Sequence, residues 1–138
     1  MDIDVRGPRF GAIVTTVVLA VVLVAGSPWL LAWQTLAFAL GAAGGVGRSP
    51  YGWVFRRVVR PRIGPPTEFE SPEPPRFAQA VGLAFAALGL VGFALGLDWL
   101  GLAATGAALA AAFLNAAFGY CLGCELYLLV RRMAVRAE

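Results

Sequence analysis

Four long stretches without a charged residue dominate this sequence and restrict what it can fold into. Residues 10–25, 29–46, 77–97 and 99–120 contain no Asp, Glu, Lys or Arg. A helix needs about 20 mostly apolar residues to cross a bilayer core of about 30 Å. Each stretch is close to that length, and the first two are slightly short. The pattern predicts an all-α membrane protein with four transmembrane helices.

Composition favours lipid as the surrounding solvent. The chain is 59% hydrophobic and 14% charged, whereas soluble domains have about 45–50% apolar and about 25% charged residues. A signal peptide is the alternative for residues 10–25. The segment before it carries Asp2 and Asp4 beside Arg6 and Arg9, so it lacks the clear positive charge of a signal peptide. We therefore expect this stretch to remain in the protein as a span.

The basic residues predict the orientation in the membrane. All 11 are arginines, and they precede span one, lie between spans two and three, or follow span four. The two short connections within the span pairs contain none. Positive segments remain on the cytoplasmic side, so the protein is expected in the cell membrane with both termini in the cytoplasm. The net charge of +3 is then a topology signal and does not indicate nucleic-acid binding.

Matching segments indicate an internal duplication. Each unit has an arginine-led entry, a span, a Trp turn, a second span and a basic tail. The first unit covers residues 7–60, the second covers 75–136, and a proline-rich cytoplasmic linker occupies 61–74. Units with two spans each are parallel repeats, related by an axis along the membrane normal. The matches are GPRF (7–10) with PPRF (74–77), WL (29–30) with WL (99–100), LGAAGG (40–45) with LNAAFG (114–119), and VFRRVV (54–59) with LVRRMA (129–134).

The tail after each second span has the spacing of an amphipathic helix. Apolar residues recur every three or four positions, and most of the arginines lie off that stripe. Both tails are predicted to lie in the inner membrane interface, or to prolong the spans. A single helix over residues 99–130 would measure about 45 Å, so we expect a bend or an exit near Gly119–Gly123.

The residue inventory excludes several kinds of chemistry. The chain has no His and no Lys, which removes imidazole bases, His-ligated metals and Schiff bases. No ionisable side chain lies at mid-membrane depth, so a proton or ion relay lacks its parts. Gln34 and Asn115 are the notable polar residues within the spans. Each is expected to hydrogen-bond a neighbouring helix, and Asn115 is also a candidate substrate contact.

The candidate catalytic residues are the two cysteines, Cys121 and Cys124, which form a CxxC motif. If the helix breaks near Gly119, Cys121 lies near the N-terminus of the tail helix, where exposed N–H groups stabilise a thiolate. Arg48 of the first unit and Glu125 are possible modulators, the first favouring and the second opposing the thiolate. A reducing cytosol argues against a permanent structural disulfide at this place.

Alternatives to a reactive dithiol remain. The cysteines can act as small apolar residues in a helix rich in Gly and Ala. Two thiolates are half of a zinc shell, so zinc is disfavoured, while Cu(I) needs fewer ligands. No cofactor is required by the pattern, and a membrane quinone is a further candidate.

The segments GPRF, RSPYG, PPRF and NAAFGYCLGCELY resemble a bacterial family of small integral membrane proteins, domain of unknown function 4395, common in actinobacteria. The resemblance covers nearly the whole chain. It implies four spans and a CxGC motif carried by Cys121, Gly123 and Cys124. Members occur alongside thioredoxin-like and thiosulfate-sulfurtransferase (rhodanese-like) proteins, which implies thiol or sulfur chemistry by association.

The first hypothesis is therefore a membrane thiol–disulfide redox or sulfur-transfer component. Cys121 would be the nucleophile and Cys124 the resolving thiol, with a cytoplasmic thioredoxin-like or rhodanese-like protein as partner. The second hypothesis is a non-catalytic structural subunit of a larger membrane complex, and the third is a small-solute carrier. Whether the protein is an enzyme is left open by the sequence.

Overall fold

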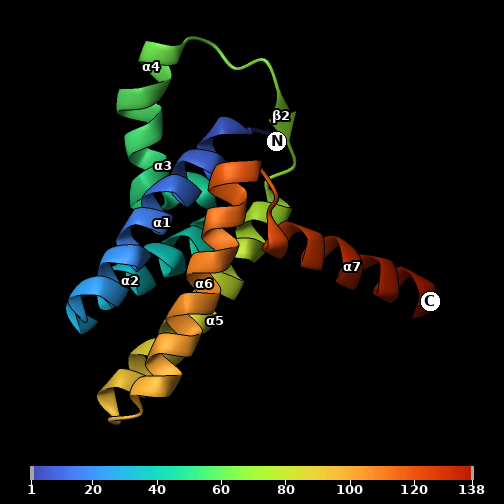
Figure 1. Cartoon of the computed structure of the whole chain (residues 1–138). Helices are drawn as coiled ribbons and strands as arrows, with labels where there is room; N and C mark the ends of the chain where they lie inside the picture. The colour runs from blue at the N-terminus through green and yellow to red at the C-terminus, as the bar shows by residue number, and fades with distance from the viewer. Residues whose placement is uncertain (1, 138) are drawn as a thin grey trace.

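The computed structural model describes residues 2–137, and most of this part of the chain is helical (Figure 1). The all-α class predicted from the sequence is therefore confirmed. A 3₁₀ turn (Val46–Arg48) precedes α3, and a π-helical segment (Phe55–Val59) joins α3 to α4. The helices are α1 (Arg6–Ala25), α2 (Pro28–Gly44), α3 (Pro50–Val54), α4 (Arg60–Ile63), α5 (Glu73–Ala94), α6 (Asp98–Phe118) and α7 (Leu122–Ala137).

Three of the helices are long and apolar enough to cross a membrane. They are α1, α5 and α6, and their mean hydropathies are 2.1, 1.9 and 1.6. Helix α2 is shorter, with 17 residues, because it ends at Gly44 instead of continuing to Val46. The length and composition of the three helices support a multi-pass membrane protein.

Tight turns link α1 to α2 and α5 to α6. Gly26 and Gly96 adopt positive φ angles of 64° and 77°, which glycine accepts without a steric penalty. The hydroxyl of Ser27 accepts a hydrogen bond from the backbone N–H of Leu30, and Pro28 occupies the first turn of α2. Both turns lie at the same end of the molecule, at the lower left of Figure 1.

The opposite end of the helix bundle holds the N-terminus, the connection from α2 to α5, and the start of α7 (Figure 1). We call it the arginine end, because the arginines lie on the α2–α5 connection, on the first turns of α1 and α5 beside it, and further along α7. The arginine-free turns and the arginine-bearing segments thus lie at opposite ends, as the charge pattern predicts.

Helices from the first half of the chain pack against helices from the second half. Helix α1 packs along α6, α2 packs along α5, and α5 also packs along α6. Small residues permit this close approach: a Cβ atom at Gly92 of α5 would lie 2.7 Å from the backbone nitrogen of Gly101 in α6. The buried core consists of Leu19, Val22, Leu31, Phe38, Ala86 and Ala108.

The linker from α4 to α5 is anchored to the N-terminus. Strand β1 (Ile3–Asp4) pairs antiparallel with strand β2 (Phe69–Glu70). The guanidinium of Arg6 donates to the Asp4 carboxylate at 2.8 Å and to the Gly64 carbonyl at 3.0 Å. The sequence predicts an extended tether here, and the structure adds that the tether is held by strand pairing.

Helix α7 leaves the bundle sideways and extends away from the other helices (Figure 1). Its first turns contact α5, while most of its later side chains are exposed. An exposed apolar surface of this kind suits a helix that lies in a membrane interface. The exposed apolar residues of α7 are Leu122, Leu126, Leu128, Leu129, Val130, Met133 and Val135.

Candidate functional site

The helical conformation is interrupted between α6 and α7, where the sequence predicts a bend or an exit. Helix α6 ends at Phe118, and Gly119 takes the left-handed conformation with a φ of 68°. The backbone N–H of Gly119 donates to the Asn115 carbonyl at 2.9 Å, and the N–H of Tyr120 donates to the Leu114 carbonyl. These bonds close the end of α6 in the usual way for a glycine-terminated helix. The predicted break is confirmed.

The cysteine pair forms the N-terminus of α7. The carbonyl of Cys121 accepts the first helical bond, from the N–H of Glu125 at 3.0 Å, and its sulfur accepts from the N–H of Cys124 at 3.1 Å. Cys121 is therefore the N-cap of the helix, a position that favours negative charge on the capping atom. A disulfide joins Cys121 to Cys124, with the Cα atoms 5.1 Å apart. Both cysteines are half-buried.

Gly123 allows the start of α7 to touch α5. A Cβ atom at this position would lie 2.5 Å from the Cβ and 2.6 Å from the Cα of Ala78. Further along α7, the hydroxyl of Tyr127 donates to the Glu73 carboxylate at 2.7 Å, and its ring lies 5.6 Å from that of Phe77. Together these contacts fix the direction of α7 and thereby the position of the disulfide.

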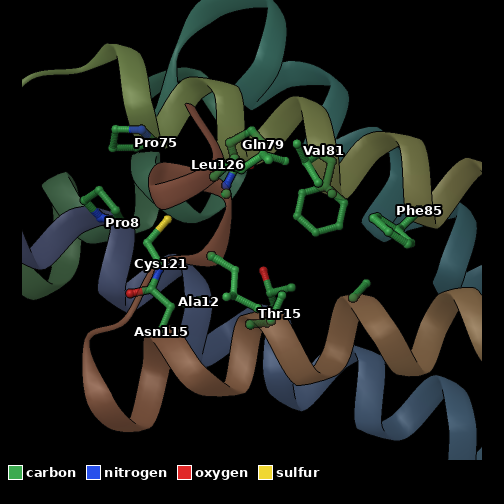
Figure 2. A pocket seen from close by; sticks show the side chains of 18 of the residues that line it. Pro8, Ala12, Thr15, Pro75, Gln79, Val81, Phe85, Asn115, Cys121 and Leu126 are labelled. Atoms are coloured by element: carbon green, nitrogen blue, oxygen red, sulfur yellow. The ribbon is translucent and has the colours of Figure 1, made fainter. Parts of the chain in front are cut away.

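A cavity of about 350 Å³ lies beside Cys121 (Figure 2). Helices α1, α5 and α6, the start of α7, and Phe38 of α2 form its walls. In Figure 2, Cys121, Asn115 and Pro75 lie towards one end and Phe85 lies at the other. Most of the lining is apolar and small. The uncharged polar side chains of the lining, besides Cys121, are Thr15, Gln79 and Asn115.

The carboxamides of Gln79 and Asn115 are the polar groups of this cavity that lack a side-chain partner in the described residues. Neither makes a side-chain hydrogen bond within residues 2–137, whereas the hydroxyl oxygen of Thr15 accepts one from Gln34 at 3.3 Å. Gln79 lies over Gly41, where a Cβ atom would come within 2.5 Å of its Oε1. The two amides can therefore offer donors and acceptors to a molecule in the cavity.

The remaining residues predicted for the site lie at different distances from the disulfide. Asn115 lines the same cavity as Cys121. Glu125 is exposed and contributes its backbone N–H to the cap of α7. Arg48 lies on the other helix pair, where its side chain packs over Gly44, and it does not line the cavity.

Two arginines that sequence reasoning did not assign to the site bind helix ends. Arg9 donates to the Ala116 carbonyl at the end of α6 at 3.4 Å. Arg76 donates to the Ala42 and Ala43 carbonyls at the end of α2, at 2.7 and 2.6 Å. A cation at a helix C-terminus is favourable. The signal was present, because both arginines belong to the recurring GPRF and PPRF segments.

The arrangement is suited to sulfur redox chemistry. A disulfide spanning the first turn of a helix can be opened by a thiolate, and the thiolate released on Cys121 is stabilised by the helix N-terminus. Within residues 2–137 no group of three or more His, Cys, Asp or Glu side chains could hold a metal ion.

The fold and site together define a small all-helical protein that has membrane-length apolar helices and a helix-capping CxxC disulfide. The chain belongs to the family described as domain of unknown function (DUF4395), whose pattern it matches over residues 3–132. No curated protein and no solved structure matches the chain significantly. The family description names no activity.

Proposed function

We propose that the protein crosses the membrane four times, and that α2 is a span in addition to α1, α5 and α6. Its 17 residues contain no charged side chain and would measure about 25 Å, which is at the lower limit for a span. Helix α2 packs along α5, one of the three longer apolar helices. A span that short fits if it crosses nearly upright, or if the bilayer thins locally.

The arginine end faces the cytoplasm in this proposal, because positive segments are retained on that side. The cysteines then lie at the inner leaflet. Labelling of intact cells with a membrane-impermeant maleimide, after mild reduction, tests this orientation. Labelling of Cys121 and Cys124 is expected only after the cells are opened, and fast labelling from outside would reverse the orientation.

Reciprocal contacts support the proposed duplication into two parallel repeats. Arg9 of the first unit binds the Ala116 carbonyl of the second, while Arg76 of the second binds the Ala42 carbonyl of the first. These residues are equivalent in the sequence matches: Arg9 with Arg76, and Ala42 with Ala116. The packing of α1 along α6 and of α2 along α5 also exchanges under the same two-fold relation.

The function that the site supports best is thiol–disulfide exchange or sulfur transfer at the membrane. One observation carries the proposal: Cys121 both caps α7 and lines a cavity, so its sulfur combines thiolate stabilisation with access to a ligand. Cys121 is the nucleophile and Cys124 the resolving thiol. The proposed partner is a cytoplasmic protein of the thioredoxin-like or rhodanese-like kind.

Exchange proceeds in two steps, which together move two electrons from the partner dithiol to the Cys121–Cys124 disulfide. A thiolate of the reduced partner attacks the sulfur of Cys121, forming a mixed disulfide and releasing Cys124 as a thiolate. The second partner thiolate then attacks the partner's own sulfur in the mixed disulfide. It releases Cys121, whose thiolate is stabilised by the cap of α7. The partner ends oxidised, and the membrane protein ends as a dithiol.

Single cysteine substitutions test this mechanism. The full chain in lipid nanodiscs is mixed with reduced thioredoxin as the probe. We expect wild type to oxidise it. Cys124→Ser, with Cys121 first converted to a mixed disulfide with thionitrobenzoate, should react with a thioredoxin that keeps only its attacking cysteine, releasing thionitrobenzoate and leaving a stable mixed disulfide at Cys121. Cys121→Ser should abolish exchange. The assignment is unambiguous, because the chain contains only two cysteines.

The matched control is Ser49→Ala, which removes the cap of α3 without touching α7. It should leave the exchange rate unchanged. A wild-type disulfide that thioredoxin cannot reduce, in a protein that is otherwise folded, would favour the structural-subunit hypothesis instead.

A further inference from the structure

We propose that the cavity beside Cys121 binds the ring of a membrane quinone, which accepts the electrons of the Cys121–Cys124 dithiol. The inference rests on the thiol–disulfide function proposed above and adds its electron acceptor. Three features of the cavity carry it: an apolar rim, two free carboxamides, and a redox-active sulfur in its wall.

The rim of the cavity determines where its ligand comes from. Among the lining residues, those with large exposed fractions are all apolar, and the lining contains no charged side chain. A ligand that enters past such a rim comes from the hydrocarbon phase and not from water. The exposed lining residues are Phe85 on α5, Ala107 on α6, and Leu122 and Leu126 on α7.

The interior of the cavity suits a ring with carbonyl oxygens. Its volume of about 350 Å³ lies within the range of small-molecule sites, which combine apolar walls with a few polar groups. The carboxamides of Gln79 and Asn115 supply N–H donors, and a quinone carbonyl accepts such bonds. A lipid acyl chain would fill the apolar part but would make no hydrogen bond to either amide.

The position of the sulfur supplies the chemistry. Cys121 lines the cavity whereas Cys124 does not, so the N-cap sulfur is the one that meets the ring. The dithiol loses two electrons and two protons as the S–S bond forms. The quinone gains them, and its two carbonyl oxygens become the hydroxyls of a hydroquinone. The disulfide is thereby restored for another reduced partner protein.

The reaction is measurable with the full chain in nanodiscs of defined phospholipid. The protein is reduced with dithiothreitol, freed of reductant, and mixed with a ubiquinone analogue that bears a decyl tail. We expect the quinone absorbance to fall as free thiols disappear, one quinone for each disulfide formed. Phenylalanine at position 111 should fill the cavity, so Ala111→Phe should slow this reaction by about tenfold or more.

The neighbouring substitution Ala110→Phe is the matched control. Ala110 lies on the same helix, is exposed, and does not line the cavity. It should leave quinone reduction at the wild-type rate. Disulfide exchange with thioredoxin should persist in both variants, because neither substitution touches the cysteines.

The outcomes separate the two proposals. If wild type exchanges disulfides with thioredoxin but does not reduce the quinone, the quinone site is wrong and the exchange function stands. If Ala110→Phe and Ala111→Phe slow quinone reduction equally, the cavity is not the site. If the purified protein retains a phospholipid acyl chain that the quinone analogue does not displace, the cavity is a lipid site. Failure of both reactions overturns both proposals.

Discussion

The first helix pair (α1 and α2, followed by α3) and the second (α5 and α6, followed by α7) close the arginine end of the bundle differently. In the first pair, Tyr51 lies against Gly11, and its hydroxyl donates to the Gln34 carboxamide at 2.6 Å. The amide of Gln34, which is 1% exposed, donates in turn to Thr15. Burial raises the pKa of the Tyr51 hydroxyl above its ordinary value. A large aromatic side chain and a buried polar network therefore fill this region.

The second pair is open at the corresponding place. The residue two positions after the cap of the tail helix is Tyr51 in the first pair and Gly123 in the second. Gly123 lies against Ala78, just as Tyr51 lies against Gly11. Alanines of α6, among them Ala107 and Ala108, line the space beside it. If the two pairs are matched as the proposed repeats, Ala108 corresponds to Gln34 and Gly123 to Tyr51, and both residues line the cavity.

The caps differ in the same direction. Ser49 caps α3 with its hydroxyl, and Cys121 caps α7 with its sulfur. The geometry of a tail helix thus needs a capping acceptor but does not need cysteine. The comparison teaches that this end is filled by side chains in the first pair, whereas in the second a cavity and a disulfide lie side by side.

The largest effect is expected where α7 approaches α5 most closely. Gly123→Ala would place a Cβ atom 2.5 Å from that of Ala78. The helices must separate, which costs about 1–3 kcal/mol and moves the disulfide away from the cavity. The thermal unfolding temperature in detergent and the rate of thioredoxin exchange should both fall.

Two further variants sharpen this test. Ala78→Gly removes one of the two atoms that the new Cβ would meet, so the double variant should recover part of the lost stability. Gly106→Ala is the control, because no atom lies within 4 Å of its added Cβ. Equal losses in the Gly123 and Gly106 variants would mean that the close approach of α7 is unimportant.

An effect on stability alone is expected from the network of the first pair. Tyr51→Phe keeps the ring but leaves the buried Gln34 carbonyl without its donor, which costs about 1–3 kcal/mol. Thermal unfolding should detect this loss, while thioredoxin exchange should stay at the wild-type rate. Tyr120→Phe is a suitable control, because Tyr120 is exposed. A loss of exchange activity in Tyr51→Phe would show that the two pairs are not functionally distinct.

Much of this arrangement could be predicted from sequence. The charge-free stretches define the long helices because charged groups are excluded from a bilayer core, and the excessive length of residues 99–130 predicts the break at Gly119. The position of Cys121 at the start of α7 follows from that break. The arginine pattern predicts that the two turns lie at the opposite end from the basic segments.

The cavity could not be predicted in this way. It depends on which small residues face each other across helices distant in sequence, such as Gly123 and Ala78, and no local pattern reports that. The end of α2 at Gly44 was also missed, because hydropathy continues to Val46 while the backbone turns at the glycines. The sequence alignment of the tails pairs Arg48 with Gly123. The caps Ser49 and Cys121 correspond instead, which shifts the register.

The reciprocal arginines allow a direct comparison of the two interfaces. Arg76 makes two hydrogen bonds of 2.7 and 2.6 Å to helix α2, and Arg9 makes one of 3.4 Å to helix α6. We expect Arg76→Ala to cost about 1 kcal/mol of stability and Arg9→Ala about half of that. Thermal unfolding at low and high salt would separate the charge contribution. Lysine at each position is the control for charge, and equal losses would contradict the observed asymmetry.

The smallest effect concerns how the first helix of each pair is held. The start of α5 is tied to α7 through Glu73, and the start of α1 is tied to the linker through Arg6. The Arg6 guanidinium, hydrogen-bonded to Asp4, holds the pKa of that carboxyl below its usual value. Asp4→Asn should therefore release the linker slightly.

Tryptic cleavage after the exposed Arg62 measures that release. We expect an increase of at most about twofold for Asp4→Asn, since Arg6 still donates to the Gly64 carbonyl and an ion pair close to the surface contributes little. The contribution of Asp4 is fully present above its unfolded-state pKa of about 3.9 and is lost as the pH falls through the lower folded-state value. Peptic cleavage near Phe69 in acid should then no longer distinguish the variant from wild type. Asp2→Asn is the control, and a difference that grows in acid would mean that the linker is held by another group.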